Sequence, residues 1–400
     1  MELRHRETLK HNFYGGALAM SGAGHLVIGT HLTHQEGLQK FSTVFIYTTV
    51  GGESPVLLQE ITQEPIDPFS LFGAEVAISN NGQFLAVSAP LMAFEGVREV
   101  GAVYLYRNDG HDHFSLIQIL QPTKVYAGQH YGRSITVSST GVLVISSAGR
   151  DDEGLSGFDI YKYSEGLGYC EFIDNLTGDE GFGRYVSISD EGERIAEGSK
   201  DRALACIFKY QPDEKNYNFE IGLGFPTEES DILPGKLKIN AAGDRIVMIS
   251  ERFIPSKYKD VRVGTVYERI MGYCSDESLI AGREIYREQW IRKHVLLIDS
   301  TLLMSDSVID FAVSDDMASI VVTTFTTTTK VIYRFQLKDD FYVKADQWSF
   351  EPFQSQFVLF GRSIVVNSDG TKVYITNALP ATSEKIRSGY GGIEIFDIVD

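Results

Sequence analysis

The side chains best suited to chemistry are scattered along this chain of 400 residues. His31 and His34 lie three residues apart, but zinc needs three or four protein ligands and the sequence identifies no further ones for this pair. His111 and His113 lie in a short hairpin between two outer strands, where exposure to solvent is expected. We therefore predict no metal site.

An acidic run at Asp151-Asp152-Glu153 could bind a cation or a basic partner, although clustered carboxylates are usually solvated. The common catalytic signatures (G-x-S-x-G, H-E-x-x-H, the P-loop and a glycine-rich turn that opens a helix) are missing from the sequence. Catalytic residues that converge from several loops leave no linear signature. We predict no catalytic residue and no cofactor, and an enzyme stays open as the alternative.

Composition argues against several classes of partner. Acidic residues number 54 against 36 basic ones, giving a net charge of −18, whereas binding to nucleic acid requires a basic surface. The start MELRHRETLK does not resemble a secretory signal, and no apolar run approaches the roughly 20 residues that span a bilayer. Cys170, Cys206 and Cys274 have no C-x-x-C spacing. We expect no nucleic acid, no direct membrane insertion, and a location in the cytoplasm or on the surface of an assembled particle.

The stretch from Leu71 to Gln121 shows the unit from which the chain is built. It reads FGAEVAIS, FLAVSAP, GAVYLYR and FSLIQILQ, four segments rich in β-branched and aromatic residues and separated by turns or loops. Asn81-Gly82, between the first two segments, is a strong signal for a tight hairpin. Four antiparallel strands alone leave an apolar face uncovered, so the unit needs neighbours of the same kind.

The unit recurs seven times along the chain. Its hairpin turn falls at residues 24, 82, 141, 192, 243, 317 and 370, with spacings of 51 to 59 residues and one of 74. Six of these positions hold glycine, which allows a positive φ, whereas the sixth copy has Met317 and its turn is expected to differ. An aromatic residue followed by glycine opens most copies and is expected to fill the space between blades. This self-similarity predicts a propeller.

We therefore expect a single all-β domain over residues 1–400, a seven-bladed β-propeller of four-stranded antiparallel blades. The last copy stops after its third strand, and ELRHRETLK precedes the first copy, so residues 2–10 are predicted to close the ring by pairing with Gly392 to Ile398. The long spacing places an insertion near 268–307. The blades are expected near 11–64, 65–121, 122–174, 175–225, 226–303, 304–352 and 353–400 plus 2–10.

Phe72-Gly73, LAVSAP and GAVYLY resemble FG-GAP repeats, which build the seven-bladed propeller of integrin α subunits. The Phe-Gly half recurs at Phe182-Gly183 and Phe360-Gly361, and Tyr14 and Tyr131 replace the phenylalanine in two other copies. Many members of that family carry a DxDxDG-type calcium loop in the first hairpin. Here those turns read SGAG, SNNG, SSTG, SDEG, NAAG and NSDG and lack the flanking acids, so no structural calcium is predicted.

The resemblance and the long, varied loops favour a non-enzymatic recognition module that binds a protein or glycan. Within this class we include an attachment or surface component of a virus or phage, because assembly of a particle would place the protein outside without targeting signals. The alternative is a hydrolase or lyase with its site at the propeller axis. Loops that join second to third strands, and one blade to the next, share one face of a propeller and supply the candidate binding residues. Tyr258, Arg387 and Tyr390 are the preferred anchors among them. The candidates are His31, His34, Arg98, Glu99, Arg150, Asp151, Asp152, Lys257, Tyr258, Lys385, Arg387 and Tyr390.

Overall fold

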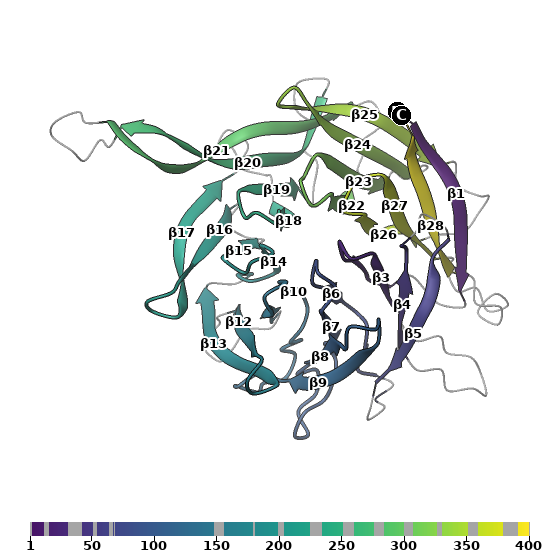
Figure 1. The fold of residues 1–400 in the computed structure, drawn as a ribbon, viewed down its shortest axis with the longest axis vertical. Helices are drawn as coiled ribbons and strands as arrows, with labels where there is room; N and C mark the ends of the chain where they lie inside the picture. The colour runs from purple at the N-terminus through teal and green to yellow at the C-terminus, as the bar shows by residue number, and fades with distance from the viewer. Residues whose placement is uncertain are drawn as a thin grey trace.

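The computed structural model is all-β, and its described residues form seven four-stranded sheets arranged around a central axis (Figure 1). The chain runs around the ring once, and each blade is an antiparallel meander from the axis outward. This confirms the predicted fold class. The structure describes residues 2–11, 16–30, 42–50, 54–63, 67, 69–147, 156–178, 181–198, 204–224, 234–250, 260–275, 284–299, 307–325, 330–350, 359–378 and 391–399.

The first four blades are each built from four consecutive strands. Blade one contains β2 (Leu18–Met20), β3 (His25–Gly29), β4 (Thr43–Thr48) and β5 (Val56–Thr62). Blade two contains β6 (Val76–Ile78), β7 (Phe84–Ala89), β8 (Ala102–Asn108) and β9 (Phe114–Leu120). Blade three contains β10 (Ile135–Val137), β11 (Val142–Ser146), β12 (Ser156–Ser164) and β13 (Tyr169–Gly178). Blade four contains β14 (Tyr185–Ile188), β15 (Arg194–Gly198), β16 (Leu204–Gln211) and β17 (Asn216–Gly224).

The remaining blades include one extended hairpin and the closure of the ring. Blade five contains β18 (Pro234–Ile239), β19 (Arg245–Ser250), β20 (Asp260–Ser275) and β21 (Glu284–Asp299). Blade six contains β22 (Ser307–Val313), β23 (Ser319–Phe325), β24 (Lys330–Lys338) and β25 (Phe341–Phe350). Blade seven contains β26 (Leu359–Val366), β27 (Lys372–Ala378), β28 (Gly391–Val399) and β1 (Glu2–His11). The hairpin of β20 and β21, each 16 residues long, projects from the ring (Figure 1).

The N-terminal strand closes the ring, as predicted. β1 pairs antiparallel with β28, in a register that sets Leu3 opposite Ile398 and Leu9 opposite Ile393. The two ends of the chain thus share one sheet, and the outer edge of β28 is covered by β1. Closure of this kind removes the open edge at which a ring could unzip or aggregate.

One turn design joins the first and second strands of every blade. In blade two, the Gly82 N–H donates to the Ser79 carbonyl at 2.8 Å, and the Phe84 N–H donates to Ser79 Oγ at 3.0 Å. In blade six, the Met317 N–H makes the same bond to the Ser314 carbonyl at 2.8 Å. The expectation of a different turn there is wrong, because Met317 adopts a φ of 54° although it has a side chain. That side chain is fully buried, and its packing offsets the strained backbone.

The aromatic-glycine pairs fill the space between blades, as expected. Phe72 is fully buried and meets Tyr104 edge-on at a centroid distance of 5.2 Å. Gly73 has a φ of 83°, and a Cβ atom there would lie 3.3 Å from the Cα of Gly29 in the preceding blade. Phe182 likewise stacks on Phe158 across a blade boundary at 5.6 Å. These contacts fix the spacing of the blades, and therefore the width of the axial opening.

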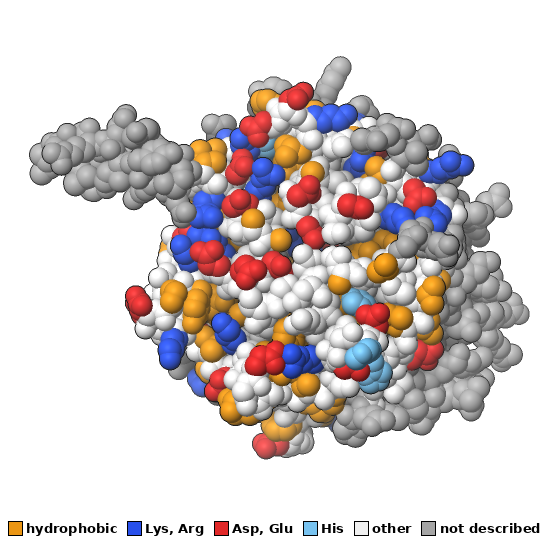
Figure 2. All heavy atoms as spheres, viewed as in Figure 1, with side chains coloured by type: hydrophobic (Ala, Val, Ile, Leu, Met, Phe, Trp, Pro, Cys, Tyr) orange, Lys and Arg blue, Asp and Glu red, His pale blue; other side chains and the backbone are white. Residues whose placement is uncertain are grey.

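The surface of the described residues carries charges of both signs interspersed with apolar side chains, on the face seen in Figure 2. No helix in the described part of the chain is long and apolar enough to cross a membrane.

Candidate functional site at the propeller axis

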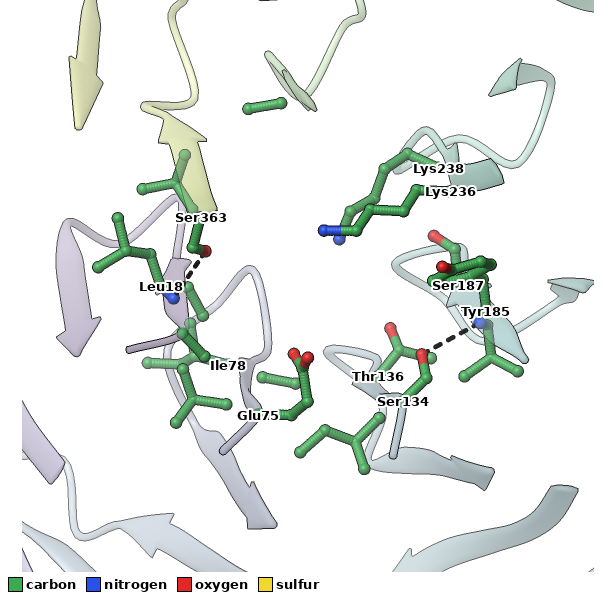
Figure 3. A pocket seen from close by; sticks show the side chains of 18 of the residues that line it. Leu18, Glu75, Ile78, Ser134, Thr136, Tyr185, Ser187, Lys236, Lys238 and Ser363 are labelled. Atoms are coloured by element: carbon green, nitrogen blue, oxygen red, sulfur yellow. Dashed lines mark hydrogen bonds between the residues drawn. The ribbon is translucent and has the colours of Figure 1, made fainter. Parts of the chain in front are cut away.

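A pocket of about 710 Å³ lies on the axis, lined by the innermost strand of every blade (Figure 3). Each of these strands alternates its side chains between two directions. One set, represented by Val76, Ile135 and Leu237, is buried between blades. The other set lines the pocket, so each blade contributes two side chains to it, at positions four and two residues before the serine or asparagine of its turn.

The two layers of side chains differ in composition. The layer nearer the start of the strands contains Ala17, Glu75, Ser134, Tyr185, Lys236, Asp310 and Ser363, in blades one to seven. The deeper layer contains Ala19, Ala77, Thr136, Ser187, Lys238, Ala312 and Val365. In the deeper layer, the polar residues come from the adjacent blades three to five, and the apolar ones from the adjacent blades six, seven, one and two. The pocket therefore has a polar half and an apolar half at this level.

Lys236 and Asp310 form an ion pair between blades five and six, with Nζ and Oδ1 2.6 Å apart. The Ile364 N–H of blade seven donates to the other carboxylate oxygen of Asp310 at 3.1 Å. Burial opposes the charged form of Lys236, but the Asp310 carboxylate outweighs it, and the pKa of Lys236 is raised above its ordinary value. This pair holds three consecutive blades together.

Lys238 extends from the same strand into the same opening, beside Lys236 (Figure 3). It has no hydrogen-bond or ion-pair partner among the described residues. Burial lowers the pKa of the Lys238 ammonium, although Asp310 and Glu75 act in the opposite direction. The side chain nevertheless contacts the water-accessible space of the pocket, so its charge is partly solvated even though protein surrounds it. Glu75 points into the opening from a separate wall (Figure 3).

Hydroxyl groups of the pocket layers also join neighbouring blades. Ser363 Oγ accepts the Leu18 N–H at 3.0 Å, and Ser134 Oγ accepts the Val186 N–H at 3.2 Å (Figure 3). The innermost strands are sheet edges, so their N–H groups need partners from outside the blade. Each of these hydroxyls keeps its own proton, and can still donate a hydrogen bond to a ligand.

The turn end of the pocket is crossed by a contact between blades that are not neighbours. Asp315 of blade six and Asn80 of blade two both line this end of the pocket, and their side chains are close enough to interact. Burial raises the pKa of Asp315, the Asn80 side chain opposes this shift, and the nearby charge of Asp190 in blade four adds to it. Because these three residues approach the axis from separate blades, they narrow the pocket at this end.

The opposite end of the pocket, toward the loops, is richer in cations. Arg133 is exposed there, and Arg184 lies 5.5 Å from the ring centroid of Tyr185. His130 Nε2 lies 3.3 Å from the Glu99 carboxylate. Arg133 and Arg184 directly precede Ser134 and Tyr185 of the first pocket layer, so they lie at the entrance on the loop side.

Two of the predicted binding residues lie within the described part of the chain. Arg98 and Glu99 are both exposed, and Glu99 reaches the pocket through its contact with His130. The Arg98 carbonyl also accepts the Gly128 N–H at 3.3 Å, so this loop is attached to the start of blade three. The other predicted residues lie outside the described residues: His31, His34, Arg150, Asp151, Asp152, Lys257, Tyr258, Lys385, Arg387 and Tyr390.

Sequence reasoning missed Glu75, Lys236, Lys238 and Asp310, because they come from three separate blades and none forms part of a motif. A usable signal was nevertheless present in the repeats. Counting back four and two residues from each turn serine or asparagine selects all fourteen residues of the two pocket layers. In that alignment, these four positions carry charged residues where most other copies have small or hydroxyl-bearing residues.

A serine, a histidine and an aspartate meet away from the pocket, in an arrangement that superficially suggests nucleophilic catalysis. Ser21 Oγ lies 3.2 Å from His25 Nδ1, and His25 Nε2 lies 2.9 Å from Asp112 Oδ1. Ser21 is only 2% exposed, and its Oγ already accepts the His25 N–H at 3.0 Å as the cap of its turn. The group therefore stabilises the contact between blades one and two, and gives a substrate no access to the hydroxyl.

The neighbouring histidines are exposed, as expected from the sequence. The side chains of His111 and His113 are 89% and 61% accessible, and both lie near Asp109. Among the described residues, no group of three or more histidine, cysteine, aspartate or glutamate side chains could hold a metal ion.

Comparison with solved structures identifies the same architecture in several proteins. The β-propeller domain of Cps50 (Swd1) from Myceliophteria thermophila aligns over 100% of both chains, with 9% identity and a TM-score of 0.55. A protein proposed to be a 6-phosphogluconolactonase, from Bacteroides uniformis ATCC 8492, aligns over 88% of both chains, with 13% identity and a TM-score of 0.53. A protein from Lactobacillus plantarum aligns over 83% of this chain and 84% of its own, with 14% identity and a TM-score of 0.51.

These similarities establish the fold alone, because the identities are low. No protein-family model matches the chain, and no curated protein matches its sequence. What sequence, structure and comparisons together establish is a seven-bladed β-propeller.

Proposed function

We propose that this propeller is a non-enzymatic recognition module, and that its protein or glycan partner engages the loop face around the mouth of the axial pocket. The observation that carries the proposal is the pocket itself, to which all seven blades contribute. A rigid ring that presents polar side chains in a cavity of about 710 Å³ is suited to binding, since ligand pockets commonly measure about 300–1,000 Å³.

The charges of the pocket support binding rather than catalysis. Asp310 is engaged by the Lys236 ammonium and by the Ile364 N–H, so its carboxylate is poorly placed to accept a proton from a substrate. In the group of Ser21, His25 and Asp112, the serine hydroxyl is buried beneath a turn. A hydrolase or lyase at the axis is the alternative, and Glu75 and Lys238 are the charged residues of the two layers that lie outside the Lys236–Asp310 pair.

The Phe-Gly openings support a finer proposal. Phe72 and Phe182 are buried between blades, and the pairs Phe72-Gly73 and Phe182-Gly183 are among the residues that carry the FG-GAP resemblance. We infer from this resemblance a role in adhesion or attachment, such as a receptor-binding component on the surface of a virus or phage particle. The partner would then contact the loop face, where Arg98 and Glu99 are exposed.

The test replaces the loop residues and measures partner binding. A glycan array and a pull-down with the intact protein would first identify the partner. Replacing Tyr258, Arg387 and Tyr390 by alanine together should then reduce affinity at least about tenfold, because tyrosine and arginine dominate binding hot spots.

The matched control is the pair His111→Ala and His113→Ala, which removes exposed side chains from a hairpin on the turn face. This pair should leave binding unchanged. Unchanged affinity in a well-folded triple variant would overturn the loop-face assignment. Turnover of any bound ligand, abolished by Glu75→Gln, would instead favour the enzyme.

A further inference from the structure

The deeper layer of the axial pocket contains one residue that the fold does not explain. At the position of Lys238, the other blades carry alanine, threonine, serine or valine, and these small side chains satisfy the packing of the ring. Lys238 forms no hydrogen bond or ion pair with a described residue, and its side chain is exposed to the space of the pocket. A long cationic side chain in a layer of otherwise small side chains is a candidate for contact with a ligand.

The side chains around Lys238 divide the pocket into two halves. Thr136 and Ser187 continue the polar side from blades three and four, and Ala19, Ala77 and Val365 belong to the apolar side. A ligand that fits this layer has an anionic group near the ammonium and hydroxyls along one edge. It also has a C–H face for the apolar side. Sugars carry both hydroxyl edges and C–H faces, and an acidic sugar adds the anionic group.

The first layer offers further partners to such a ligand. Glu75 can accept hydrogen bonds from ligand hydroxyls, and the hydroxyls of Ser134, Tyr185 and Ser363 can donate to ligand oxygens. Arg133 and Arg184 flank the entrance on the loop side, and would attract an anion toward Lys238. The turn end of the pocket, by contrast, carries the negative charges of Asp190 and Asp315.

We propose that the axial pocket binds an anionic sugar, whose carboxylate or phosphate is held by the Lys238 ammonium and whose C–H face packs on Ala19, Ala77 and Val365. This proposal rests on the proposed function, because it names the class of ligand that enters the pocket from the loop face. A volume of about 710 Å³ accommodates one or two sugar rings, so the pocket would take the terminal residue of a glycan or a free acidic sugar.

The test is calorimetric titration of the intact protein with small probes, which needs no knowledge of the natural partner. Glucuronate and glucose 6-phosphate carry the two candidate anionic groups, and glucose is their neutral counterpart. Acetate and inorganic phosphate supply the anion without the sugar. We expect at least one acidic sugar to bind more tightly than glucose and than the matching simple anion, by about tenfold or more.

The decisive variant is Lys238→Met, which keeps the length of the side chain and removes its charge. It should weaken binding of the acidic sugar at least about tenfold, whereas Lys238→Arg should retain most of the affinity. Lys124→Met removes the same charge from an exposed site outside the pocket, and should change nothing. The melting temperature of the Lys238→Met variant should be no lower than that of the native protein, because the substitution breaks no described hydrogen bond or ion pair.

Three results would overturn the proposal. One is equal binding of glucose and both acidic sugars, and another is undiminished binding by Lys238→Met. The third is binding of an acidic peptide by the pocket when neither acidic sugar binds. If neither acidic sugar binds but the Tyr258, Arg387 and Tyr390 variant still loses its partner, the sugar proposal fails and the proposed function stands. If that variant keeps its partner but an acidic sugar binds through Lys238, the sugar site stands and the loop-face assignment fails.

Discussion

Lys236 of β18 and Asp310 of β22 belong to different blades, and their ion pair spans the boundary between them at 2.6 Å. Asp310 also accepts the Ile364 N–H from the next blade, so one carboxylate connects blades five, six and seven. Lys238, two residues further along β18, points the same way but makes no such contact. Two lysines of one strand thus have separate roles: the first holds the ring together, and the second is available to a ligand.

Replacing Lys236 by methionine should lower the free energy of unfolding by about 1–2 kcal/mol, because it leaves the largely buried Asp310 with only the Ile364 N–H as a described partner. Urea unfolding monitored by fluorescence measures this change. Lys238→Met is the matched control on the same strand and should cost little or nothing. Equal losses for the two variants would contradict the separate roles of the two lysines.

Removal of residues 2–10 should lower the melting temperature strongly, since it takes away all of β1 except His11 and uncovers nearly all of the paired edge of β28. Scanning calorimetry of the truncated chain, with light scattering to detect aggregation, makes the comparison. The control is Arg6→Ala, which removes the ion pair with Asp397 at 3.4 Å but keeps the pairing of β1 with β28, and should cost far less than the truncation. A truncated protein that melts as the intact one does would show that β1 contributes little to closure.

The fold could be predicted because its determinants are local and recur in every copy. Gly82 marks a tight turn, Phe72-Gly73 marks the junction between blades, and alternating apolar residues mark the strands. The pocket could not be predicted in the same way, since its residues come one or two at a time from strands that meet only after the ring has closed. Met317 shows a second limit, because burial of its side chain overrides the backbone preference on which the turn prediction depended.

Met317 therefore allows backbone strain and burial to be measured separately. Met317→Ala removes the buried side chain and keeps the strained φ of 54°, so it should destabilise the protein by about 2–4 kcal/mol. Met317→Gly removes the same contacts but relieves the strain, and should be at least as stable as the alanine variant. At Gly243, where φ is 69°, the change Gly243→Ala should cost about 1 kcal/mol. An alanine variant clearly more stable than the glycine variant at 317 would contradict strain at this turn.

Glu197 is fully buried in β15, and its Oε1 accepts the Gly183 N–H at 2.7 Å. Burial raises the pKa of this carboxyl from 4.5 to about 8, although the hydrogen bonds from Gly183 and Cys206 oppose the shift. The folded protein thus keeps the proton over a pH range in which the unfolded chain has lost it. The resulting contribution to stability is complete below about pH 4.5 and is lost as the pH rises to about 8.

Glu197→Gln should remove this dependence, because glutamine cannot ionise and retains an oxygen for the Gly183 N–H. Between about pH 5 and about pH 8, the unfolding free energy of the native protein should fall relative to that of the variant, with a slope of up to about 1.4 kcal/mol per pH unit. Urea titrations at several pH values measure the difference. Glu171→Gln, at an exposed position of β13, should retain the native pH profile. Parallel profiles for the native protein and Glu197→Gln would show that this carboxyl does not hold its proton in the folded state.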